Sequence, residues 1–275
     1  MTLPTTPPTF TPIAPLEPLQ PSPRAGGRAI VALVLREMAT TFGRSPGGWI
    51  WAVAEPVAVI ALLSFAFSLA FRAPSLGTSF PLFYATGYLP FLLFQDVSTK
   101  MAQALRFSRP LMTYPRVTLF DALAARLALN IATHLVVASI VIVGIEALWP
   151  TDAQYDARRL AAGFFMAAVV AVGIGTLNCF LFTAIPAAER VWLIVSRPLF
   201  IASGVFYIFE DLPGSLGDLL WYNPLLHSVC AVRAGAYGEY DATYVTPLYP
   251  LGLGLGALTL GLVLLRGRGA DLTRG

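Results

Sequence analysis

Residues 28–71 read RAIVALVLREMATTFGRSPGGWIWAVAEPVAVIALLSFAFSLAF, a basic amphipathic segment that leads directly into a long apolar one. At 100° per residue, the apolar side chains of residues 28–44 share one arc and the charged ones share the other, with Leu33 as the exception. Such a helix is typical of a membrane interface, where its arginines face anionic head groups. Gly43 and the Pro-Gly-Gly run at 46–48 then end it. We therefore expect the chain to enter a bilayer at residues 49–51.

The whole chain is strongly apolar. Of its 275 residues, 56% are hydrophobic and only 12% are charged, and the mean hydropathy is +0.70. Soluble domains carry about 25% charged residues. The composition therefore predicts an all-α integral membrane protein, and the net charge of +3 is too small to indicate nucleic-acid binding.

Six stretches are long and apolar enough to cross a bilayer, which takes about 20 residues for a hydrocarbon core of about 30 Å. They are 50–71, 81–97, 119–148, 160–184, 191–209 and 247–265. The chain thus divides into a tail at 1–25, an interface helix at 26–48 and a six-span domain at 49–275. The tail has eight prolines and no signal-peptide core, so we expect a disordered cytoplasmic segment; a polyproline ligand for a partner is the alternative.

Lysine and arginine predict the orientation of the spans. With the N-terminus in the cytoplasm, fourteen of the 18 Lys and Arg residues lie on or near the inner side and four on the outer side. An even number of spans also returns the C-terminus to the cytoplasm.

The segment at 210–246 is too long for a simple turn between spans five and six. It is rich in aromatic residues and contains an apolar run at 225–232. We expect two short helices that dip into the outer leaflet or close a pathway; an ordinary outer loop is the alternative.

Catalytic signatures do not occur in the sequence. There is no HExxH, GxSxG or Walker A motif and no metal-ligand cluster. His134 lies in span three beside Asn130 and Thr133, which favours a packed, hydrogen-bonded histidine over a catalytic one.

Glycines in two spans indicate close helix packing. Gly252 and Gly256 form a small-xxx-small pair in span six, and Gly173 and Gly175 lie in span four. Such residues let the backbones of membrane helices approach closely.

Four charged residues lie near the inner ends of spans: Glu55, Asp96, Asp121 and Arg126. A charge costs about 2.5–3.5 kcal/mol at the centre of a membrane and less near its edge. We therefore expect either a polar collar at the cytoplasmic mouth of a pathway or side chains that each reach the interface independently.

Aromatic residues are dense in the first two spans, and they include Trp51, Phe65, Tyr88 and Phe91. Interface belts and lipid-facing packing explain aromatic residues of this kind. Because sugar rings present apolar C–H faces that stack on aromatic rings, these four are also candidates to line a path for a glycan.

The inner loop at 100–126, KMAQALRFSRPLMTYPRVTLFDALAAR, is short and basic. Arg106, Arg109 and Arg116 lie in or beside a segment that Pro110 and Pro115 stiffen. Such a projection is suited to docking on a cytoplasmic partner; a connector that obeys the positive-inside rule is the alternative.

Four motifs resemble, in order, those of the KpsM-like family of ABC-2-type capsule polysaccharide export permeases, with O-antigen exporters as close relatives. They are REMATTFGRSPGGWIWAVAEP at 36–56, RPLMTYPRVTLFDALAAR at 109–126, SRPLFIASGVFYIFEDLP at 196–213 and WYNPLLHSVCAVRAG at 221–235. One departure is Cys230, which stands where a glutamate is common in the family, seven residues after the asparagine of the Asn-Pro turn.

The resemblance implies the transport subunit of an ATP-driven exporter in the bacterial inner membrane. Two copies of the chain would pair with two separate ATPase subunits, which bind ATP and magnesium, while this chain binds no cofactor. A polysaccharide, often with a lipid-linked end, would move from the cytoplasm to the periplasm, with periplasmic or outer-membrane export components as further partners.

The resemblance also implies roles for individual residues. The residues expected to contact the ATPase are Arg28, Arg36, Glu37, Arg44, Arg106, Phe107, Arg109, Tyr114 and Arg116. The residues expected in a periplasmic gate are Tyr207, Trp221, Asn223, His227 and Arg233.

Other functions remain open on the sequence alone. Within transport, the alternative substrates are O-antigen, teichoic acid or lipid. Outside it, a membrane-embedded glycan transferase would have to use Glu55, Asp96 and Asp121, and a non-catalytic scaffold would not explain the kinked spans.

Overall fold

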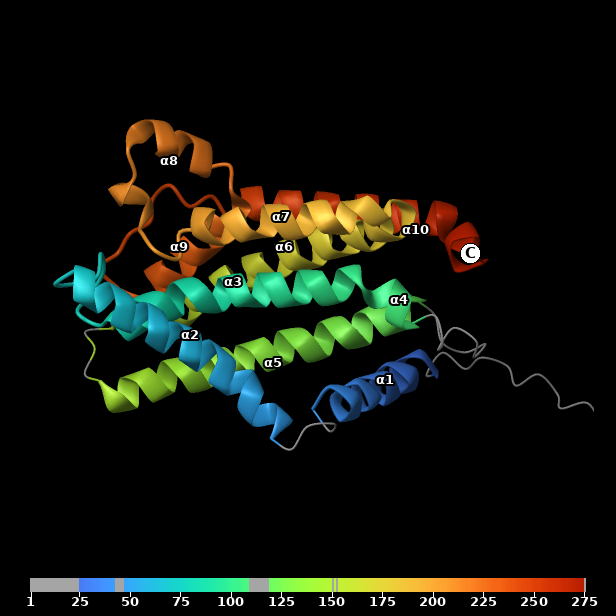
Figure 1. Cartoon of the computed structure of the whole chain (residues 1–275), viewed down its shortest axis with the longest axis horizontal. Helices are drawn as coiled ribbons and strands as arrows, with labels where there is room; N and C mark the ends of the chain where they lie inside the picture. Colours follow the sequence, from blue (N-terminus) through green and yellow to red (C-terminus); the bar gives the residue numbers. More distant parts are fainter. Residues whose placement is uncertain (1–24, 43–46, 109–118, 150, 152, 275) are drawn as a thin grey trace, which may run out of the picture.

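The computed structural model describes residues 25–42, 47–108, 119–149, 151 and 153–274, and every regular element among them is a helix (Figure 1). The elements are α1 (Ala25–Phe42), α2 (Gly48–Ala70), α3 (Phe80–Ala102), α4 (Ala104–Ser108), α5 (Leu119–Leu148), α6 (Ala157–Ala184), α7 (Pro186–Ala202), the 3₁₀-helix η1 (Phe209–Asp211), α8 (Gly214–Leu220), α9 (Pro224–Ala236) and α10 (Leu248–Arg274).

The predicted tail at 1–25 lies outside the described residues, apart from Ala25, which begins α1. The break between α1 and α2 falls where the glycines and the proline predict it. Gly47, at the N-terminal cap of α2, has a φ of 82°, which a glycine adopts without strain.

The two central helices are α3 and α6. Helix α6 packs against α3, α9 and α10, and most of α3 is buried. In Figure 1 the long helices run side by side, with α1, α4 and the C-terminus at one end of the bundle and α8 at the other. We call these the α4 end and the α8 end.

Four helices of the described chain are long and apolar enough to cross a membrane: Gly48–Ala70, Leu123–Leu148, Ala157–Ala184 and Leu248–Gly267. Helices α3 and α7, the second and fifth predicted spans, are not among them. Helix α3 carries Asp96 and Lys100, and because it is buried among other helices it does not need an apolar surface. Helix α7 has 17 residues and includes Glu189 and Arg197.

The predicted fifth span at 191–209 is wrong at both ends. Helix α7 begins at Pro186, in the first-turn position that proline favours, and it ends at Ala202. Gly204 then takes a φ of 77° and reverses the chain, so the apolar residues at 205–208 are not helical. Apolar composition alone did not indicate this turn.

Two short helices, α8 and α9, lie in the segment for which the sequence predicts them. Asn223 caps α9 by accepting a hydrogen bond from Leu225 N at 3.0 Å, and Pro224 occupies the first turn. The Asn223 amide also donates to the Ala202 carbonyl oxygen at 2.9 Å, which fixes α9 to the end of α7.

The predicted glycine pair in α10 is wrong, because Gly252 and Gly256 have open space where a side chain would project. The close approach uses the opposite face of α10. A Cβ atom on Gly173 would lie 2.0 Å from the carbonyl oxygen of Gly254, and one on Gly261 would lie 2.8 Å from Leu177 N. Helices α6 and α10 therefore touch backbone to backbone.

Replacing Gly173 with valine is expected to push α10 away from α6 and to destabilise the protein by about 1–3 kcal/mol or more, as overpacking does. Thermal unfolding in detergent would measure this loss. Gly252→Val is the matched control, since nothing lies near that position. Equal unfolding temperatures for the two variants would contradict the observed packing.

Candidate functional site

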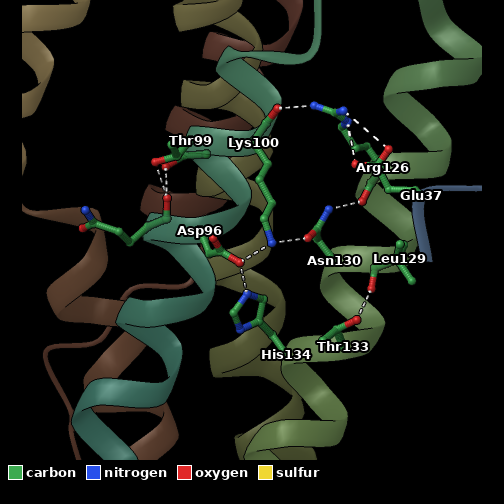
Figure 2. Close-up of polar contacts among 11 residues, drawn as sticks. Glu37, Asp96, Thr99, Lys100, Arg126, Leu129, Asn130, Thr133 and His134 are labelled. Atoms are coloured by element: carbon green, nitrogen blue, oxygen red, sulfur yellow. Dashed lines mark hydrogen bonds and ion pairs between the residues drawn. The ribbon is translucent and has the colours of Figure 1, made fainter. Parts of the chain in front are cut away.

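Polar side chains from α3 and α5 meet inside the bundle (Figure 2). Lys100 Nζ donates to Asp96 Oδ2 at 2.6 Å and to Asn130 Oδ1 at 2.7 Å. His134 Nε2 lies 2.8 Å from the same Asp96 oxygen. One carboxylate oxygen therefore joins a cation on its own helix to a ring on the neighbouring helix.

Helical spacing explains how these groups meet. Asp96 and Lys100 are four residues apart on α3, and Arg126, Asn130 and His134 follow at four-residue intervals on α5. Residues four apart share one helix face. An unpaired charge between apolar helices is costly. The contact between Asp96 and Lys100 therefore stabilises the carboxylate and the ammonium group inside the bundle.

Arg126 extends the network to α1. Its Nε lies 3.2 Å from Glu37 Oε1, and its Nη1 donates to the Lys100 carbonyl oxygen at 3.5 Å (Figure 2). Its side chain is only 13% exposed, so the pair is better shielded than a surface salt bridge. One guanidinium thus connects α1, the last turn of α3 and the first half of α5. We call Glu37, Asp96, Lys100, Arg126, Asn130 and His134 the polar bracket.

The structure brings together only part of the predicted collar. Asp96 and Arg126 belong to the polar bracket, whereas Glu55 is exposed on α2 and makes no hydrogen bond or ion pair with it. The side chain of Asp121 lies outside the described residues. Sequence reasoning omitted Lys100 from the collar, although its spacing of four from Asp96 was a usable signal.

A second charged contact fixes α4 to the junction of α6 and α7. Arg106 Nη1 lies 2.7 Å from Glu189 Oε2, and Arg106 Nη2 donates to the Phe182 carbonyl oxygen at 3.3 Å. Glu189 is in the first turn of α7, where an acidic side chain complements the helix dipole. Arg106 therefore joins α4 to the end of α6 and the start of α7.

A double-mutant cycle of Arg106→Ala and Glu189→Ala is expected to show coupling between these two residues. Each single substitution should lower the free energy of unfolding by a similar amount, about 0.2–1 kcal/mol, and the double variant should lose no more than a single one. Unfolding of the four proteins in detergent would measure this. Additive losses in the double variant would show that the residues act independently.

Of the residues expected to contact an ATPase, the structure describes three side chains. Arg36 is exposed on α1, Glu37 is half-buried in the polar bracket, and Arg106 holds α4. The side chains of the others lie outside the described residues: Arg28, Arg44, Phe107, Arg109, Tyr114 and Arg116.

At the α8 end, all five expected gate residues take part in hydrogen bonds between segments, through a side chain or a carbonyl oxygen. His227 is fully buried; its Nε2 lies 2.8 Å from the Trp221 carbonyl oxygen, and Thr246 N donates to its Nδ1 at 3.4 Å. Burial lowers the pKa of His227, which matches a neutral ring that donates from Nε2 and accepts at Nδ1. The Trp221 ring stacks on Tyr249 at 5.4 Å, so the segment is fastened to the start of α10.

Arg233 is the largest fully buried side chain among the described residues. Its guanidinium donates to the carbonyl oxygens of Tyr207 and of Val205, the latter at 3.0 Å, and it lies 4.1 Å from the centre of the Phe83 ring. The backbone after the Gly204 turn has few helical hydrogen bonds of its own, so Arg233 supplies donors to it. This arginine therefore holds the turn between α7 and α8 against α3 and α9.

The four candidate glycan-path aromatics fall into two pairs. Tyr88 and Phe91 are buried on α3 and contact Phe200 of α7, with ring centres 6.1 and 5.0 Å apart. Trp51 and Phe65 are exposed on α2, each with 66% of its surface accessible. Only the α2 pair lies on an open surface of a single copy of the chain.

The fold and these contacts define an all-helical membrane protein with a charged bracket at one end and a hydrogen-bonded cap of short helices at the other. Residues 28–237 match the model of the family described as ABC-2 type transporter. This chain belongs to the ABC-2 type transporter family.

Relatives extend over nearly the whole chain. It is 26% identical to the capsule polysaccharide export inner-membrane protein CtrC of Neisseria meningitidis over 236 residues, 86% of this chain and 89% of that protein. It is 26% identical to the polysialic acid transport protein KpsM of Escherichia coli over 87% of this chain and 93% of that protein. The capsule polysaccharide export inner-membrane protein BexB of Haemophilus influenzae is also 26% identical, over 87% and 91% of the two chains.

Proposed function

We propose that the chain is the membrane permease subunit of an ATP-driven exporter that moves capsular polysaccharide from the cytoplasm to the periplasm. The observation that carries this proposal is the near full-length match to three proteins whose names state capsule polysaccharide export or polysialic acid transport. All of them are covered over about nine-tenths of their length, so the likeness is not limited to a shared segment.

The proposed topology has six spans, formed by α2, α3, α5, α6, α7 and α10, in the bacterial inner membrane. Helix α1 lies at the cytoplasmic interface, and both termini are cytoplasmic. Two observations support this orientation: basic residues predominate at the α4 end, and α1 and the C-terminus lie at that same end (Figure 1). In this orientation α8 and α9 face the periplasm.

The energy source is assigned to a separate ATPase subunit, which would carry ATP and magnesium. The sequence has no Walker A motif, and α1 and α4 present basic residues at the proposed cytoplasmic end. The polar bracket and the Arg106 contact would pass movements of a docked ATPase to α3, α5 and α7.

A second copy of the chain is proposed to complete the pathway. An exposed stripe on α2 has members at alternating intervals of four and three residues: Trp51, Glu55, Ala58, Leu62 and Phe65. Helix α7 exposes Arg197 between Ile194 and Ile201 on a similar face. Since charges rarely face lipid unpaired, we assign Glu55 and Arg197 to an interface between copies.

Reversing one of these charges is expected to weaken the dimer, and reversing both is expected to restore it. Glu55→Arg and Arg197→Glu should each raise the monomer fraction in detergent about tenfold, an effect of about 1.4 kcal/mol. Mass photometry of the single and double variants would measure this. A double variant as monomeric as the singles would contradict pairing between these residues.

Deleting the gene in its host tests the function. We expect surface polysaccharide to disappear and polymer to accumulate in the cytoplasm, with both effects reversed by the wild-type chain. Affinity purification of that chain should recover an ATPase. Loss of O-antigen or teichoic acid with capsule intact would identify a different substrate, and recovery of active protein with no ATPase would refute the proposal.

A further inference from the structure

A long apolar groove runs along the surface formed by α5, α6 and α10. Its main part has a volume of about 800 Å³, and its walls include Leu127, Ile131, Phe165, Val172 and Leu255. Helices α5 and α6 touch only sparsely along their length, which leaves this space between them.

A second hollow of about 380 Å³ continues the groove toward the α8 end. The two hollows share Leu135, Ala161 and Phe164, and the second reaches Glu146 and Tyr155. From Leu127 to Glu146 the α5 helix rises about 28 Å at 1.5 Å per residue. The groove therefore extends over nearly the whole depth of a bilayer core, which is about 30 Å.

The chemistry of the walls restricts what can lie in the main part of the groove. Its lining is formed almost entirely by aliphatic side chains and phenylalanine rings, and small residues such as Ala162 and Ala168 keep it deep. A polar occupant would lose its hydrogen bonds to water and find no replacements there. An acyl chain gains about 0.8 kcal/mol for each methylene that it buries.

Glu146 lines the outer end of the groove, and an arginine lies about one helical turn before the groove wall on α6. Glu146 Oε1 accepts hydrogen bonds from Thr151 Oγ1 and from Tyr155 Oη, the latter at 2.8 Å, and Oε2 has no partner among the described residues. Burial and this hydrogen bond raise the pKa of Tyr155, so its hydroxyl stays a donor. Arg158, which is exposed, lies four residues before the groove-lining Ala162 and thus on the same face of α6.

We propose that this groove is a binding site for a zwitterionic phospholipid with a primary amine, such as phosphatidylethanolamine. One acyl chain lies between α5 and α6, the ammonium group pairs with Glu146, and the phosphate pairs with Arg158. The proposal uses the membrane orientation given above but does not depend on which polymer is transported. The residues that line the groove take no part in the polar bracket.

Native mass spectrometry of the full-length protein, with phosphatidylethanolamine and phosphatidylglycerol added separately, tests this site. We expect wild-type protein to retain phosphatidylethanolamine at least about tenfold more tightly than phosphatidylglycerol, a difference of about 1.4 kcal/mol. Glu146→Gln keeps an acceptor for Thr151 and Tyr155 but removes the charge, so it should abolish this preference. Glu239→Gln, an exposed carboxylate elsewhere on the same side, is the matched control.

Filling the groove should remove both lipids. In Ala161→Trp the new side chain projects into both hollows, and in Leu255→Trp it narrows the main hollow. The second variant keeps the test valid if the first does not fold. Leu260→Trp is the control, because Leu260 is as exposed as Leu255 but does not line the groove. Equal retention of both lipids by wild type and by both groove variants would overturn the proposal.

Two other occupants would also overturn it. Capture of the lipid end of the polysaccharide, with no retention of phosphatidylethanolamine, would make the groove a substrate site. Disulfide cross-linking between copies through cysteines placed at Ser139 would make it an interface between protomers. Neither outcome would change the proposed export function, which the gene deletion tests separately.

Discussion

Replacing Arg126 with alanine is expected to lower polysaccharide export at least tenfold while the protein still reaches the membrane. The substitution removes the ion pair to Glu37 and the hydrogen bond to the Lys100 carbonyl oxygen. A hydrogen bond to a charged group contributes about 1.5–3 kcal/mol, and removing one partner of a shielded pair costs more than removing a surface pair. Helix α1 would then no longer move together with α3 and α5.

Two readouts separate loss of coupling from loss of folding. In vesicles that contain the whole transporter, Arg126→Ala should lower export at least tenfold, about 1.4 kcal/mol, while ATP hydrolysis continues. The reversed pair, Glu37→Arg with Arg126→Glu, should restore part of the export. Arg72→Ala, an exposed arginine after α2, is the control. Normal export by Arg126→Ala would exclude the polar bracket from energy transfer.

Replacing Arg233 with leucine is expected to have the largest effect on stability of any single substitution at the α8 end. Leucine leaves the carbonyl oxygens of Val205 and Tyr207 without the guanidinium donors, inside the protein. Unsatisfied buried groups cost about 1–3 kcal/mol each. We expect the free energy of unfolding to fall by about 3 kcal/mol or more and the segment after α7 to become accessible to protease.

Limited proteolysis and thermal unfolding would measure this effect. Arg233→Lys keeps the charge but cannot reach two carbonyl oxygens in a fixed fork, so an intermediate loss is expected. Arg72→Leu removes an exposed arginine and should leave both readouts unchanged. If Arg233→Leu unfolds at the wild-type temperature, the arginine does not hold the turn after Gly204.

Much of the helical layout could be predicted from the sequence. Hydrophobic runs identified α2, α5, α6 and α10, and turn residues placed the break between α1 and α2. The apolar run at 225–232 lies within α9, one of the short helices expected in that segment. These features depend on local composition or on residues adjacent in sequence. The end of α7 could not be predicted from the hydrophobic pattern, because apolar residues continue beyond the Gly204 turn.

The candidate site was less predictable than the fold. Asp96 and Arg126 were identified as costly charges, but their partners depend on how α1, α3 and α5 pack. Which glycines of α10 make a close backbone contact depends in the same way on where α6 lies. Tyr88 and Phe91 show the same limit, since only tertiary structure places them against Phe200 rather than on an open surface.

The measurement that tests the central proposal most directly is transport by the purified chain, reconstituted with its ATPase subunit in vesicles. With ATP and capsular polymer on the cytoplasmic side, we expect polymer to enter the lumen. An inactive ATPase should abolish this entry. No entry of polymer with an assembled complex that hydrolyses ATP, or entry without the ATPase, would contradict the proposed function.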